Sequence, residues 1–153
     1  MLCGEYKSHQ IQDSSFVRSW LKDQYGVEFG KNALPLRNCE GRHEFDVVSS
    51  NGKIVAEIKT ASGPTSGGKH PSGKRASAFE QLYFLSLVNA DVKLLVITDA
   101  EFLEIMKSRT VGIVPADIEL VKCPLPQHLE EIVLSITSEA SKEIDRGKKS
   151  FSG

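Results

Sequence analysis

Two carboxylates and a lysine lie on either side of a tight-turn signal. Asp46 precedes the dipeptide Asn51-Gly52, and Glu57 and Lys59 follow it. Asn and Gly both tolerate positive φ, so this dipeptide predicts a β-hairpin. Side chains alternate between the two faces of a strand, so Glu57 and Lys59 point the same way, with Asp46 on the partner strand. The pattern therefore predicts that two acids and an ammonium group meet on one face of a two-stranded ribbon.

The second strand of this hairpin has an apolar pattern. Val55, Ala56 and Ile58 flank the charged residues. Burying a charged pair among them costs several kcal/mol unless the charges are paired or bind an ion. One interpretation is a surface hairpin in which Lys59 pairs with Glu57 or with an acid across the strands. The other is a metal site, because two carboxylates and a backbone carbonyl suit Mg²⁺, with Mn²⁺ as an alternative cation.

The residues Asp46 and, after the turn, Glu57-Ile58-Lys59 resemble the core motif of the PD-(D/E)xK nucleases. These metal-dependent DNA-cutting enzymes include restriction endonucleases and archaeal Holliday-junction resolvases. The sequence departs from the pattern where Phe45, and not Pro, precedes the acid. The resemblance covers about residues 10–100. It implies an α/β fold with a restriction endonuclease-like core, in which helices flank a central mixed β-sheet.

The resemblance also implies roles for the hairpin residues. Asp46 and Glu57 would bind Mg²⁺, with the carbonyl of Ile58 as a further ligand. Lys59 would orient or deprotonate the attacking water and stabilise charge on the phosphate. The implied reaction is hydrolysis of DNA phosphodiester bonds.

Other candidates carry a competing interpretation. Gln81 resembles the Gln or Lys that the family often has near the start of the following helix, and a solvent-facing helix residue is the alternative. Family members often have a third acid on the first helix; Glu5 and Asp13 are the candidates here, and Asp13 can equally cap that helix. His43 is interpreted as a solvated or structural residue. Ser77-Ala78-Phe79-Glu80 has the form of a capping box that opens a helix.

The segment 62–75 is rich in Gly, Ser and Pro and predicts a loop. It contains the basic residues Lys69, Lys74 and Arg75 and no acid. Such residues can hold a DNA backbone without reading its sequence. The alternative is a flexible solvated linker. The segment does not match the phosphate-binding loop of nucleotide triphosphatases.

Periodicity and capping signals predict the remaining elements. They are a helix from Asp13 or Ser14 to Tyr25 that Gly26 ends, a strand around Ala33–Leu36 with Pro35 at an edge or bend, a helix from Ser77 to Asn89, a strand over Val92–Thr98, a helix over Glu101–Arg109 capped by Asp99, strand pieces at Ile113–Val114 and Ile118–Lys122, a C-terminal helix over 129–140, and a frayed tail over 145–153. This order predicts an α/β fold.

The overall composition restricts the class of protein to which this chain can belong. A chain of 153 residues with 40% hydrophobic and 25% charged residues has the make-up of a single globular domain. Net charge is −1, so DNA contact would need a local basic patch. Three distant cysteines predict neither a zinc site nor a disulfide scaffold, and the lack of a signal-peptide core or apolar span predicts a cytoplasmic protein. An inactive nucleic-acid-binding module, or a subunit of a DNA-processing complex, is the alternative function, and a homodimer is the alternative explanation of the C-terminal apolar stripe.

Overall fold

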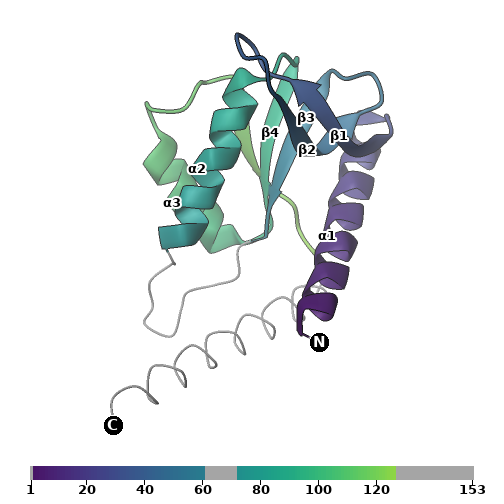
Figure 1. Cartoon of the computed structure of the whole chain (residues 1–153). Helices are drawn as coiled ribbons and strands as arrows, with labels where there is room; N and C mark the ends of the chain where they lie inside the picture. Colours follow the sequence, from purple (N-terminus) through teal and green to yellow (C-terminus); the bar gives the residue numbers. More distant parts are fainter. Residues whose placement is uncertain (1, 61–71, 127–153) are drawn as a thin grey trace.

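A computed structural model describes residues 2–60 and 72–126, with side chains from 14–60 and 73–126. Five strands form one sheet, and three helices pack on it (Figure 1). The elements are α1 (Leu2–Tyr25), β1 (Phe29–Pro35), β2 (Arg42–Ser49), β3 (Ile54–Lys59), α2 (Ser72–Leu87), β4 (Val92–Ile97), α3 (Ala100–Thr110) and β5 (Ile118–Lys122).

The strands lie in their chain order, β1-β2-β3-β4-β5. The first three pair antiparallel, whereas β3, β4 and β5 pair parallel. A parallel pair needs a crossover connection, and α2 and α3 provide the two crossovers. The mixed central sheet with flanking helices confirms the predicted α/β class.

Helices cover both faces of the sheet, as Figure 1 shows with α1 on one side and α2 and α3 on the other. On the α1 side, Val17 and Leu21 of the helix pack with Ala56 of β3. On the α2 side, Val55 belongs to the cluster that contains Phe102 of α3. Alternate residues of β3 therefore enter opposite cores, which explains its nearly continuous apolar sequence.

The predicted hairpin forms, but its turn differs from the expected one. Among the described non-glycine residues only Asn38 has positive φ, so Gly52, with φ of 73°, adopts that conformation and Asn51 does not. Side chains complete the turn: the N–H of Ile54 donates to Oγ of Ser49 at 2.9 Å. A longer loop closed by a polar side chain thus replaces the two-residue turn.

Both long helices begin earlier than their capping signals predict. Helix α1 begins at Leu2, so Asp13 and Ser14 lie inside it and neither is a cap. Helix α2 begins at Ser72, so the capping-box interpretation of Ser77 is wrong. The same helix includes Lys74 and Arg75, which the sequence assigned to a loop. A local capping pattern cannot exclude further helical residues before it.

Three predictions on the second half of the chain have clear outcomes. The side chain of Asp99 caps α3 by accepting from the N–H of Phe102 at 2.9 Å. The strand Ile118–Lys122 is confirmed. The strand predicted at Ile113–Val114 is wrong, since both N–H groups donate to the carbonyl of Thr110 in a turn.

In the first half, β1 begins at Phe29, earlier than the predicted strand, and Pro35 lies on an edge strand as expected. The chain stops being helical at Tyr25, and Gly26 follows with φ of 70°. Segments 61–71 and 127–153 lie outside the described residues, together with Lys69 and the predicted C-terminal helix and tail. Among the described helices, none is long and apolar enough to cross a membrane.

Candidate functional site

A β-bulge in β2 positions Asp46. Against β1, Phe45 pairs with Asn32 and Val48 pairs with Gly30, so β2 uses three steps where β1 uses two. Such a bulge changes the direction in which a side chain points. Oδ2 of Asp46 accepts a hydrogen bond of 3.0 Å from the backbone N–H of Ile58 on β3. The acid is thereby fixed beside the C-terminal half of β3.

Glu57 on β3 is a buried carboxyl group in contact with three side chains. Its side chain is only 4% exposed. Oε1 lies 3.1 Å from Nε2 of His43, and Oε2 lies 3.5 Å from Nε2 of Gln81. Burial, followed by a hydrogen bond to Asp46 and the charge of Asp46, raises the pKa of Glu57 to about 9. Two acids therefore meet in a place where both cannot readily be ionised.

Gln81 reaches this pair of acids from α2. Its Nε2 donates to the carbonyl of Ile58 at 2.9 Å. Its Oε1 is buried and has no hydrogen-bond partner. A buried polar atom without a partner is unusual in a native structure and points to a bound group or water. The sequence-predicted Gln81 thus faces the hairpin acids and not solvent.

Lys59 lies two residues beyond Glu57 and is hydrogen-bonded to Ser77, which the sequence analysis interpreted as a helix cap. Its Nζ donates to Oγ of Ser77 at 2.6 Å. Burial lowers the pKa of Lys59, the charge of Lys74 lowers it further, and Asp46 and Glu80 oppose this shift. Ser77 and Gln81 are four residues apart and share one face of α2, a spacing that could have revealed Ser77.

His43 is a second residue that sequence reasoning missed. It is an odd number of residues from Asp46, so a regular strand would direct the two side chains to opposite faces. The bulge removes this alternation, and His43 contacts Glu57. Its ring stacks on Phe84 of α2, with centroids 3.8 Å apart and planes 3° apart. No local pattern announces a bulge at this position.

The structure thus brings together Asp46, Glu57, Ile58, Lys59 and Gln81. Their oxygen donors are two carboxylates and a backbone carbonyl, the set that the sequence suggested for Mg²⁺. Across the described residues, no group of three or more His, Cys, Asp and Glu side chains is arranged to hold a metal ion.

The basic residues and the proposed third acid are only partly accounted for. Lys74 lies in the first turn of α2, close enough for its charge to lower the pKa of Lys59, and Arg75 follows it. The pKa of Lys74 itself is lowered by burial. Lys69 and the side chains of Glu5 and Asp13 lie outside the described ones.

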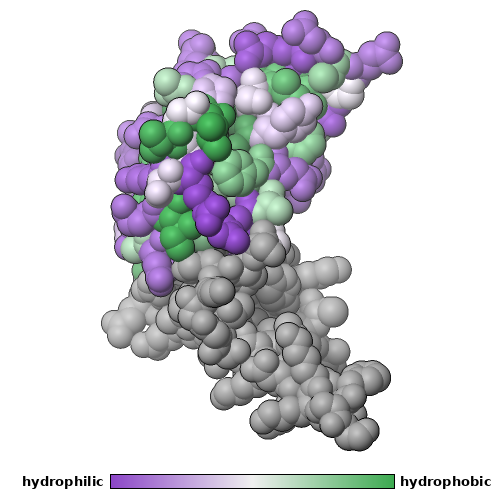
Figure 2. Space-filling view, turned by 90° about the vertical axis from the view of Figure 1, so that its left-hand side faces the viewer, coloured by the Kyte–Doolittle hydropathy of each residue, from purple (hydrophilic) through white to green (hydrophobic). Residues whose placement is uncertain are grey.

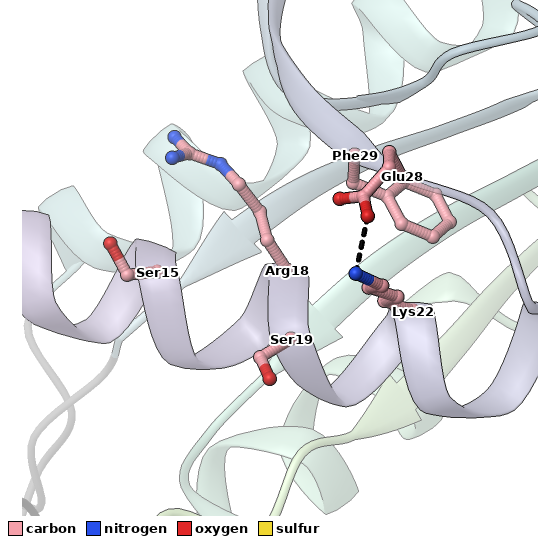
Figure 3. A pocket seen from close by; sticks show the side chains of 6 residues that line it. All are labelled: Ser15, Arg18, Ser19, Lys22, Glu28 and Phe29. Carbon is pink, nitrogen blue, oxygen red and sulfur yellow. Dashed lines mark ion pairs between the residues drawn. The ribbon is translucent and has the colours of Figure 1, made fainter.

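A separate pocket of about 320 Å³ opens between α1 and the beginning of β1 (Figure 3). Four α1 side chains line it at helical spacing, and β1 and the residue before it supply the rest: Ser15, Arg18, Ser19, Lys22, Glu28 and Phe29. Lys22 forms an ion pair with Glu28. No residue of the Asp46–Glu57 site lines this pocket.

Comparisons of the chain with protein-family models, with curated proteins and with solved structures give no match. The functional argument therefore depends on the chemistry of the site.

Proposed function

We propose that this protein is a metal-dependent endonuclease that hydrolyses phosphodiester bonds in DNA, built on a restriction endonuclease-like core. The observation that carries the proposal is the contact between the carboxyl group of Asp46 and the buried carboxyl group of Glu57, near the charge of Lys59. Enzymes create such pairs where a cation or a proton must be held. The mixed sheet, with three antiparallel strands followed by two parallel crossovers, supports the α/β core that the resemblance implies.

The donor atoms fit a divalent cation. The pKa of Glu57 is about 9, so both acids are ionised at neutral pH only when a positive charge offsets their repulsion. The unpartnered Oε1 of Gln81 is a further oxygen near the carbonyl of Ile58. Asp46, Glu57 and the Ile58 carbonyl would hold Mg²⁺, or Mn²⁺, which prefer oxygen ligands. A bound ion of this kind polarises a phosphate and lowers the pKa of water.

Lys59 is the group that would handle the proton and the charge. A lysine with a lowered pKa can act as a base nearer neutral pH than an exposed one. The hydroxyl of Ser77 accepts from its Nζ and fixes the direction of the side chain. Lys59 would orient or deprotonate the attacking water and stabilise charge on the phosphate.

Gln81 and the basic residues would position the DNA. The amide of Gln81 already bridges the carbonyl of Ile58 and Glu57, and it would orient the nucleophile or a phosphate oxygen. Lys74 and Arg75, at the beginning of α2, and Lys69 before it would contact the sugar–phosphate backbone.

The test is Mg²⁺-dependent cleavage by purified wild-type protein and by Lys59→Ala. Labelled duplex, flap, single-stranded and four-way-junction DNAs are incubated with Mg²⁺ or with EDTA. The expected result is cleavage by the wild type only with Mg²⁺ and at least about 100-fold slower cleavage by the variant. Lys53→Ala, an exposed lysine in the turn of the same hairpin, is the matched control and should cut normally. Full cleavage by a folded Lys59→Ala protein would reject the assignment.

The second candidate is a nucleic-acid-binding module without catalysis. It is favoured by the hydrogen bonds that already occupy the acids: Ile58 N–H on Asp46, and His43 and Gln81 on Glu57. Titration calorimetry with Mn²⁺ separates the candidates. Heat of binding that Asp46→Asn abolishes supports the enzyme, whereas no binding at millimolar Mn²⁺ supports the inactive module.

A further inference from the structure

Four aromatic rings form a continuous row beside Glu57. The ring of His43 meets that of Phe45 edge-on, with centroids 4.7 Å apart, and stacks on that of Phe84, with centroids 3.8 Å apart. Phe84 in turn meets Tyr83 edge-on at 5.5 Å. We call these four residues, Phe45, His43, Phe84 and Tyr83, the aromatic row.

The aromatic row runs from the core to the surface. Phe45 is fully buried, the side chain of His43 is 26% exposed, and Tyr83 is 59% exposed. His43 is hydrogen-bonded to Glu57, so the row begins at the candidate metal site. Figure 2 views the side of the molecule on which α2 and α3 lie, where apolar side chains appear among polar ones. The ring of Tyr83 is exposed and is held by contact with Phe84, so another planar ring can stack on it.

An exposed arginine, Arg37, lies at the C-terminal end of α2. Arg37 donates to the carbonyl of Ser86, and its N–H donates to the carbonyl of Leu87, so it lies against the last turn of the helix that carries Tyr83. Arg42 is also exposed, but it is adjacent to His43 on β2, so its side chain leaves the opposite face of the strand and donates to the carbonyl of Ala33. The guanidinium group of Arg37 is held by a backbone carbonyl and has further N–H donors available for phosphate.

Acidic residues restrict where a phosphate backbone can lie. Glu80 is exposed one helical turn before Tyr83, and Glu40 is exposed in the same β1–β2 loop as Arg37. A polyanion would therefore avoid both acids and approach Tyr83 beside the Arg37 guanidinium, which is held on the carbonyl of Ser86 one helical turn beyond the ring. The charges on the two sides of Tyr83 differ, as a directional binding surface requires.

We infer that the aromatic row binds an unpaired segment of DNA, with a base stacked on Tyr83 and a phosphate held by Arg37. Bases in a duplex are already stacked on their neighbours, so an exposed ring gains a stacking partner only from an unpaired base. The inference rests on the proposed function, since it names single-stranded or flapped DNA as the substrate class of that site.

The test measures binding apart from cleavage. Fluorescence anisotropy in EDTA gives the affinity of a labelled oligothymidylate and of a duplex of equal length. Tyr83→Ala should weaken binding of the single strand about 5- to 150-fold, the range expected for loss of one stacked base, and should change duplex binding less than about twofold. Tyr83→Phe keeps the ring and should bind like the wild type.

Tyr25→Ala is the matched control, because Tyr25 is 39% exposed and also meets a phenylalanine edge-on, but on α1. It should leave binding of both DNAs unchanged. Unaltered single-strand binding by Tyr83→Ala, an equal loss for the duplex, or no single-strand binding by the wild type at low salt would overturn the inference.

The two proposals fail in different ways. Mg²⁺-dependent cutting of duplex DNA by Tyr83→Ala at the wild-type rate, with unchanged oligothymidylate affinity, would leave the nuclease proposal standing without the aromatic site. Selective loss of single-strand binding in a protein that never cuts DNA would leave the aromatic site and remove the nuclease.

Discussion

The protonation of Glu57 makes a quantitative prediction for the metal-free protein. Its ordinary pKa of 4.5 rises to about 9 in the folded state. The folded protein therefore keeps a proton at neutral pH that the unfolded chain releases. A group of this kind contributes most stability below pH 4.5, and its contribution is lost as the pH rises toward the folded pKa.

The magnitude follows from the difference in bound protons. Between pH 4.5 and about 9 the folded state binds one more proton, so the free energy of unfolding falls by about 1.4 kcal/mol per pH unit from this group. At pH 7.5 this amounts to up to about 4 kcal/mol. Glu57→Gln removes the titration but keeps the shape and an N–H donor directed at Asp46. The variant should therefore gain up to about 4 kcal/mol over the wild type between pH 4.5 and 7.5.

Urea unfolding in EDTA, followed by circular dichroism at several pH values from 5 to 8, measures this difference. The free energies of the wild type and Glu57→Gln should diverge steadily as the pH rises. Glu44→Gln is the matched control, because Glu44 also belongs to the hairpin, yet its side chain is 61% exposed. That variant should follow the wild type within about 0.5 kcal/mol.

Parallel curves for Glu57→Gln and the wild type would refute the reasoning, because they would show that Glu57 is ionised in the folded protein. Adding Mg²⁺ provides a second check. The free energy of unfolding of the wild type should rise with the logarithm of the Mg²⁺ concentration, whereas that of Glu57→Gln should not change.

Three further predictions concern the site and the helix that follows β4. The affinity for Mg²⁺ should rise about tenfold per pH unit up to about pH 9, because the ion competes with the proton of Glu57; calorimetry that gave a constant affinity would contradict this. Asp46→Ala should lose about 1–3 kcal/mol in urea unfolding, because the N–H of Ile58 loses its acceptor, whereas Asp46→Asn, which keeps an acceptor, should lose less. Asp99→Ala should lose about 1 kcal/mol, since the N–H of Phe102 loses its cap, and Asp99→Ser should restore most of it.

Several features of the fold were predictable because their causes are local. The apolar run over Val92–Thr98 has few alternatives to a buried strand, and β4 spans Val92–Ile97. Gly52 tolerates positive φ and lies in the hairpin turn. Asp99 precedes a helical pattern and caps it. In each case the cause lies within one short segment of the sequence.

Other features depend on contacts between distant segments. Ser77 and Glu80 match a capping box, yet α2 begins earlier, and Ser77 accepts from Lys59 instead. The apolar pair Ile113–Val114 suits a strand, but its N–H groups donate to the carbonyl of Thr110 in the turn that follows α3. Propensity is a weak guide where tertiary contacts compete.

The residue types at the site could be read from the sequence: Asp46 precedes a turn, and Glu57 and Lys59, two residues apart on one strand, point to the same face. Their protonation states and their neighbours in space could not be predicted from the sequence. Packing against α2 buries Glu57, brings Gln81 into contact with Glu57 and brings Ser77 into contact with Lys59. The bulge in β2 brings His43 into contact with Glu57. Burial and hydrogen bonding are properties of the assembled tertiary structure, so residue spacing can predict which groups meet but not the pKa values they acquire there.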